Sequence, residues 1–159
     1  MIHLLFKILT GVRRCGKSTI LKMIQKKLKE EHHITGEQIL SYRFDSMEYE
    51  DMTSKELYQE LKTKILNTKK TYLFLDEIQN ITGWEKFVRR IADMKYRINI
   101  TGSNSKMLSS EIASTLGGRF VIMNIYPYSF SEYLIANHMK KNYLDVISTK
   151  DKADVQNQI

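Results

Sequence analysis

The stretch Gly11-Val-Arg-Arg-Cys-Gly16-Lys17-Ser18 lies between an apolar run and an amphipathic segment. Its residues fit the spacing G-x-x-x-x-G-K-[ST]. Glycines let the backbone turn so that its amides point at phosphate oxygens, and the start of a helix adds a positive dipole end. We therefore predict a loop that binds a nucleotide, in which Lys17 reaches the β- and γ-phosphates and the Ser18 hydroxyl binds Mg²⁺. The residues predicted to bind the nucleotide are Gly11, Val12, Arg13, Arg14, Cys15, Gly16, Lys17, Ser18 and Thr19.

Around this loop, five short strand-like runs alternate with helical patterns. The expected strands span residues 2–9, 38–44, 71–75, 97–101 and 120–125. The segment after the loop carries Ile20, Ile24 and Leu28 at a spacing of four residues, which is typical of an amphipathic helix. Strands that alternate with helices indicate an α/β fold with a parallel sheet.

Two further helices are marked by capping boxes, one at Thr53 and Glu56 and one at Ser129 and Glu132. In this pattern the hydroxyl and the carboxylate each satisfy an amide that the start of the helix leaves unpaired. The spacing of apolar residues predicts another helix at residues 107–116.

A second motif is Tyr72-Leu-Phe-Leu75-Asp76-Glu77, an apolar run that ends in two carboxylates. The carboxyl end of a buried parallel strand lies on the same sheet edge as the phosphate loop. There Asp76 can hold Mg²⁺, and Glu77 can accept a proton from the water that attacks the γ-phosphate. A hydrophobic run before Asp-Glu is common by itself. In partnership with the loop, however, it favours ATP hydrolysis over phosphate transfer to a small molecule.

Two later positions have open interpretations. Ser103 and Asn104 follow another expected strand, where either could hold the attacking water, although Ser103 or Ser105 could simply cap a helix. Arg119 follows Gly117-Gly118 and could reach a neighbouring subunit's γ-phosphate. The alternative is a surface arginine favoured by a helix dipole.

Five stretches occur in order: Thr10 to Thr19, Leu73 to Gln79, Thr101 to Ser105, Leu116 to Arg119 and Tyr126 to Tyr133. Together they resemble the prokaryotic AAA+ ATP-binding proteins that pair an N-terminal ATPase domain with a C-terminal domain of unknown function. The resemblance covers roughly residues 5 to 134.

This resemblance implies a three-layer P-loop NTPase fold with a sheet in the order 5-1-4-3-2. It implies the roles already described for the phosphate loop and the carboxylate pair. It also implies a sensor at Ser103 or Asn104 and self-association through Arg119 as a finger.

Proteins of this group usually carry a helix before the first strand and continue into a helical lid. We therefore expect residues 1–134 to form the nucleotide-binding core. Residues 135–159 are expected to begin an incomplete lid or a disordered tail. On this interpretation the chain is a fragment, a truncated gene product or a degenerate copy.

Composition narrows the class of protein. The chain has 159 residues and a net charge of +7; this length suits one compact core. No apolar run approaches the roughly 18 residues that a membrane-spanning helix needs, so no membrane partner is expected. The single cysteine cannot form an internal disulfide, which suits the cytoplasm.

Three functions are compatible with these patterns. The first is an Mg²⁺-dependent ATPase that releases ADP and phosphate. The second is a nucleotide-binding interaction module that does not hydrolyse ATP by itself. The third is a basic protein that associates with nucleic acid under the control of ATP. The charge permits that association, but no helix-turn-helix or zinc-finger pattern supports it.

Overall fold

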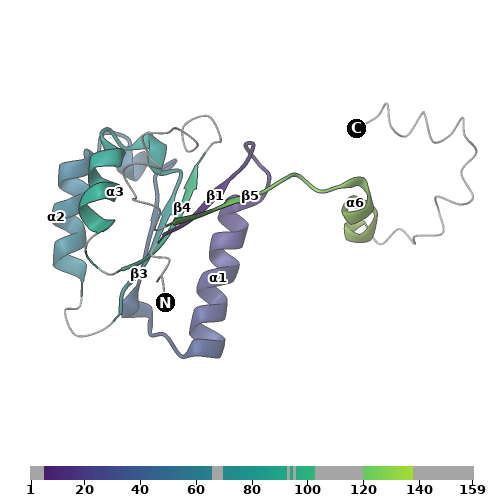
Figure 1. Cartoon of the computed structure of the whole chain (residues 1–159), viewed down its shortest axis with the longest axis horizontal. Helices are drawn as coiled ribbons and strands as arrows, with labels where there is room; N and C mark the ends of the chain where they lie inside the picture. The colour runs from purple at the N-terminus through teal and green to yellow at the C-terminus, as the bar shows by residue number, and fades with distance from the viewer. Residues whose placement is uncertain (1–5, 66–69, 93, 95, 103–119, 138–159) are drawn as a thin grey trace, which may run out of the picture. The chain divides into compact units, whose positions relative to one another are not determined.

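The computed structural model of the chain contains a five-stranded parallel sheet (Figure 1). The structure describes residues 6–65, 70–92, 94, 96–102 and 120–137. The strands are β1 (Phe6–Thr10), β2 (Ile39–Arg43), β3 (Tyr72–Asp76), β4 (Arg97–Gly102) and β5 (Phe120–Asn124). Their spatial order is β2-β3-β4-β1-β5, which confirms the predicted 5-1-4-3-2 order.

Helices cover the two faces of this sheet. Helix α1 (Lys17–His32) lies on one face, and α2 (Ser54–Lys64) and α3 (Trp84–Ala92) lie together on the other (Figure 1). Alternation along the strands assigns side chains to the two layers. In β3, Phe74 packs in the cluster with Leu21 of α1, whereas Leu73 and Leu75 pack in the larger cluster with residues of α2 and α3.

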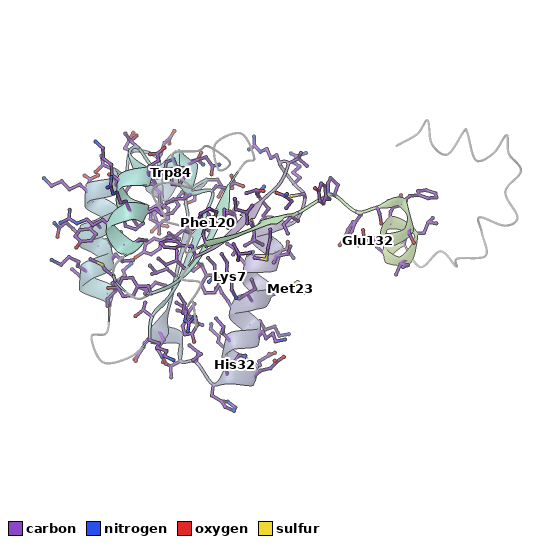
Figure 2. The ribbon with its side chains drawn as sticks, viewed as in Figure 1. Lys7, Met23, His32, Trp84, Phe120 and Glu132 are labelled. Atoms are coloured by element: carbon purple, nitrogen blue, oxygen red, sulfur yellow. The ribbon has the colours of Figure 1, made fainter. Side chains whose placement is uncertain are left out.

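The side-chain view agrees with these layers. Trp84, 5% exposed, belongs to the larger cluster on the α2 and α3 face (Figure 2). Met23, 64% exposed, lies on the side of α1 away from the sheet (Figure 2). Within the described residues, no helix is long and apolar enough to cross a membrane.

The strand ends differ slightly from the predictions. The first strand continues to Thr10, one residue past the expected end, because Thr10 pairs with Gly102 on one side and Asn124 on the other. Three short 3₁₀ helices were not predicted: η1 (Gly36–Gln38), η2 (Met47–Tyr49) and η3 (Ile78–Asn80). Three residues provide too few positions for a periodic pattern to be visible in sequence.

Both capping boxes are confirmed. At α2, the Thr53 hydroxyl accepts a hydrogen bond from the Glu56 amide, and the Glu56 carboxylate accepts one from the Thr53 amide at 2.8 Å. The carboxylate bonds hold the pKa of Glu56 below its usual value.

The chain divides into two compact units after Ile125. The described part of the second unit contains α6 (Phe130–Ala136). Ser129 and Glu132 form its capping box, with a carboxylate-to-amide distance of 2.8 Å. The helix predicted at residues 107–116 lies outside the described residues.

Candidate functional site

The predicted phosphate loop connects the end of β1 to the first residue of α1. Gly16 takes a left-handed conformation (φ 96°) and its carbonyl accepts the first helical hydrogen bond, from the Ile20 amide at 3.0 Å. Glycine adopts this conformation without the penalty of a side chain. The turn therefore places Lys17 and Ser18 at the start of the helix, where backbone amides are unpaired.

Gly11 is required by close packing. A Cβ atom at this position would lie 2.2 Å from the Ile125 carbonyl oxygen and 2.6 Å from the Cys15 sulfur. Both distances are shorter than van der Waals contact. The first residue of the loop therefore has to be glycine, because the backbone of Ile125, the residue after β5, leaves no room for a side chain.

Lys17 is only 4% exposed although it carries a charge. Its Nζ donates to the Gly11 carbonyl at 3.2 Å and to the Val12 carbonyl at 3.1 Å, and lies 3.5 Å from Glu77 Oε1. A buried ammonium needs such partners because desolvation is costly. The lysine therefore joins the phosphate loop to the carboxylate motif after β3.

Thr101 of β4 joins the two carboxylate residues. Its hydroxyl donates to Asp76 Oδ1 at 2.5 Å and accepts from the Glu77 amide at 2.9 Å. Asp76 is 7% exposed. This arrangement fixes the Asp76 carboxylate at the edge of the sheet.

Glu77 is held in a left-handed conformation (φ 55°), which a non-glycine residue adopts at some energetic cost. The turn directs its side chain back toward the phosphate loop. Oε1 faces Lys17, and Oε2 accepts a hydrogen bond from Gln79 Nε2 at 2.5 Å. Both oxygens of the predicted base are therefore paired.

A cavity of about 540 Å³ opens at this edge of the sheet. Its lining is polar, with four cationic and two anionic side chains. The lining residues are Arg13, Arg14, Lys17, Ser18, Arg43, Asp45, Glu77, Gln79 and Asn80.

The predicted residues come together to a large extent. Five of them line the cavity: Arg13, Arg14, Lys17, Ser18 and Glu77. Gly11, Val12, Cys15, Gly16 and Thr19 contribute to the loop and the first turn of α1. Ser103, Asn104 and Arg119 lie outside the described residues, so their predicted roles stay predictions.

Sequence reasoning missed Arg43 and Asp45, which line the cavity from the end of β2. Arg43 pairs with Asp76 in the sheet register, and its guanidinium donates two hydrogen bonds to Asp45, at 2.7 and 3.0 Å. This pairing holds the pKa of Asp45 below its usual value. The usable signal was the strand order, because it places the end of β2 beside the end of β3.

Gln79 and Asn80 were also missed as site residues. Both belong to η3, the short helix after Glu77. Asn80 Nδ2 donates to the Phe44 carbonyl at 3.1 Å, which ties this turn to the end of β2. Gln79 lies two residues after Glu77, and only the left-handed turn returns its side chain to the carboxylate.

The loop, the carboxylate pair and the strand order are also found together in known proteins. The model of the AAA domain family matches residues 5–134. The chain belongs to the AAA domain family. The matched region of this AAA domain includes every residue that lines the cavity.

Two curated relatives of the AAA domain are described as uncharacterized proteins. One, from Haemophilus influenzae, is 38% identical over 136 residues, covering 84% of this chain and 34% of the relative. The other, from Methanocaldococcus jannaschii, is 39% identical over 154 residues, covering 94% of this chain and 32% of the relative. The chain therefore spans about one third of the length of these relatives.

Solved structures share the fold. A DNA polymerase III gamma subunit-related protein of Thermotoga maritima matches with a TM-score of 0.58 at 9% identity, covering 89% of this chain and 48% of that protein. PCH-2 of C. elegans matches with a TM-score of 0.52 at 17% identity, covering 92% and 43%. At such identities the likeness concerns the fold of the AAA domain.

Proposed function

We propose that this AAA domain binds ATP with Mg²⁺ and hydrolyses it to ADP and phosphate. The observation that carries the proposal is the meeting of Lys17 and Glu77, 3.5 Å apart, at one edge of the parallel sheet. One residue suits binding of a phosphate chain, and the other suits activation of water. Family membership supports nucleotide binding independently.

The residues fit a nucleoside triphosphate. The cavity of about 540 Å³ falls in the usual range of small-molecule sites, roughly 300–1,000 Å³. Four cationic side chains line it, from Arg13, Arg14, Lys17 and Arg43. They outnumber the two carboxylates of the lining, Asp45 and Glu77, and this excess of positive charge suits a polyphosphate. The helix start adds its amides and dipole.

The residues also fit Mg²⁺. The Ser18 hydroxyl and the Asp76 carboxylate are hard oxygen donors, and Mg²⁺ is commonly held by one or two protein groups together with phosphate oxygens and waters. Among the described residues, no cluster of three acidic, histidine or cysteine side chains offers another metal site. Bound Mg²⁺ would supply neutralisation of the charge on the phosphates.

In the proposed reaction, a water molecule attacks the γ-phosphate of bound ATP. Glu77 accepts a proton from the attacking water while the water oxygen forms a bond to the γ-phosphorus. The bond from that phosphorus to the β,γ-bridging oxygen breaks, and ADP leaves with the electron pair. Lys17 stabilises the negative charge on the phosphate oxygens.

The test is MgATP binding and turnover by wild type, Lys17→Ala and Glu77→Gln. We expect Lys17→Ala to weaken MgATP binding by about tenfold or more, because a charged hydrogen-bond donor is lost. Glu77→Gln should retain binding and lower turnover by about 10²–10⁴-fold. Wild-type protein that binds MgATP without turnover would instead support the second function, a nucleotide-binding interaction module that does not hydrolyse ATP by itself.

The nucleic-acid alternative receives less support from the basic face of α1. Lys26 and Lys27 lie 3.8 and 3.4 Å from Glu30 and Glu31, so this face carries charges of both signs.

The lone cysteine supports a cytoplasmic setting for the activity.

A further inference from the structure

Gln79 has an unusual hydrogen-bonding arrangement beside Glu77. Its Nε2 donates to Glu77 Oε2 at 2.5 Å, while its Oε1 is buried and has no partner among the described residues. A buried acceptor without a partner is destabilising. The carboxamide therefore gains its contact with Glu77 at a cost to the stability of the fold.

The chemistry of the two groups fixes this orientation. An ionised carboxylate only accepts hydrogen bonds, so the amino end of the carboxamide must face Glu77. Turning the carboxamide over would place two acceptors against each other. Gln79 Oε1 is thus left without a partner because Nε2 donates its hydrogen bond to Glu77, the proposed base.

The turn that carries Gln79 is anchored on both sides. Ile78 is fully buried in the larger core cluster, and the Asn80 side chain bonds to the Phe44 carbonyl. These two contacts hold η3 against the sheet. Gln79 therefore approaches Glu77 from a fixed backbone.

The partners of the Glu77 carboxylate come from different places. Oε2 is held by Gln79 from the same turn, whereas Oε1 faces Lys17 of the phosphate loop at 3.5 Å. Lys17 is the side chain that a γ-phosphate would engage. Engagement of Lys17 by phosphate would free Oε1, whereas the contact of Oε2 with Gln79 does not involve Lys17.

We propose that Gln79 is a positioning residue that holds Glu77 by Oε2, so that Oε1 can exchange Lys17 for the attacking water. The role rests on the proposed ATPase function. The proton of the water passes to Oε1 of Glu77, and Gln79 takes no part in bond formation. Its contribution is to limit the orientations of the base when Lys17 turns to the phosphates.

The experiment compares wild type with Gln79→Met and Gln79→Glu. Methionine has a similar length without the amide donor, and glutamate has the same shape with a repelling charge. Gln25→Met is the matched control, because Gln25 also donates a side-chain hydrogen bond, to Ser41 at 3.1 Å, outside the cavity lining. Three quantities are measured for each protein: kcat, the Kd for MgATP and the Kd for ADP with aluminium fluoride, a transition-state analogue.

We expect both Gln79 variants to lose about ten- to a hundredfold in kcat. In Gln79→Met, affinity for ADP with aluminium fluoride should fall by a similar factor, whereas the Kd for MgATP should change by less than about twofold. In Gln79→Glu the new negative charge in the cavity lining should also weaken MgATP binding. Gln25→Met should match wild type in all three quantities. In Gln79→Met, an equal loss of affinity for both ligands would show a merely structural role and overturn the proposal, as would an unchanged kcat.

The outcome also separates this role from the ATPase proposal. A wild-type protein without turnover refutes the ATPase proposal and the role of Gln79 with it. Turnover that depends on Glu77 and survives both Gln79 substitutions refutes only the role of Gln79. If Gln79→Met fails to fold, Gln79→Leu, a second neutral side chain without the amide donor, provides the same comparison.

Discussion

The Nζ atom of Lys17 lies 3.5 Å from Oε1 of Glu77. The lysine is almost fully buried and the glutamate is partly exposed. The same ammonium donates to two carbonyls of its own loop. A phosphate that engages Lys17 must therefore compete with three oxygen atoms, of which only Glu77 carries a full charge.

This competition predicts that Glu77→Gln tightens MgATP binding. Lys17 is buried, so removal of the competing negative charge should improve the Kd by about fivefold or more, which corresponds to about 1 kcal/mol or more. Isothermal titration at low salt measures the change. A Kd weaker than that of wild type would show that Glu77 supports nucleotide binding rather than competing with it.

Thr101→Val should disturb the carboxylate pair without a large change in shape. The Thr101 hydroxyl bonds to both Asp76 and the Glu77 amide, and valine leaves these groups unpaired. We expect a loss of about 1–3 kcal/mol in the free energy of unfolding, measured with denaturant.

The matched control for that substitution is Thr63→Val, at an exposed site on α2. The Thr63 hydroxyl donates to the Glu60 carbonyl at 2.7 Å, which water can replace. Its unfolding free energy should stay within about 0.5 kcal/mol of wild type. Equal effects at the two sites would contradict the special role of Thr101.

Gly11→Ala and Gly16→Ala should both lower the free energy of unfolding, by different amounts and for different physical reasons. At Gly16 nothing lies within 4 Å of a new Cβ, so only the left-handed backbone opposes alanine, at about 1–2 kcal/mol. At Gly11 the new Cβ would meet the Ile125 carbonyl at 2.2 Å. Overpacking costs about 1–3 kcal/mol or more.

Thermal and denaturant unfolding should therefore rank Gly11→Ala as less stable than Gly16→Ala. The reverse order would show that the loop can move away from the end of β5 at little cost.

Tyr42→Phe should improve stability at alkaline pH. Burial, reinforced by the charge of Glu60, raises the pKa of the Tyr42 hydroxyl far above its usual value. The folded state therefore keeps the proton after the unfolded chain has released it, at about pH 10. Stability from this group is complete below pH 10 and is lost as the pH rises further.

Phenylalanine removes that dependence. The Tyr42 hydroxyl has no hydrogen-bond partner among the described residues, so little is lost at pH 8. Above pH 10 the free energy of unfolding of the variant should exceed that of wild type by about 1.4 kcal/mol per pH unit. Denaturant titrations at pH 8, 10 and 11 test this. Parallel losses in both proteins would contradict it.

The sequence predicted those parts of the site that depend on short, regular patterns. The phosphate loop needs glycines at set positions, and Asp76 ends an apolar run, so both are visible without a structure. The strand order followed from the family resemblance. It explains why residues from β1, β3 and β4 meet at one edge.

The remaining site residues depend on conformations without a periodic pattern. Gln79 reaches Glu77 because Glu77 takes a left-handed backbone conformation. The neighbouring residues in the sequence do not predict this conformation. Arg43 and Asp45 reach the cavity because β2 pairs with β3 although 28 residues separate Arg43 from the start of β3. In each case the deciding contact lies in the tertiary fold.

The crowding at Gly11 has a consequence for how this protein can vary. The Ile125 amide donates to the Thr10 carbonyl at 2.7 Å, and the Ile125 carbonyl occupies the space that a side chain at position 11 would need. The start of the phosphate loop and the residue after β5 are thus held together by one hydrogen bond and one close backbone contact. A sequence change that moves the backbone at Ile125 would therefore also change the conformation of the phosphate loop.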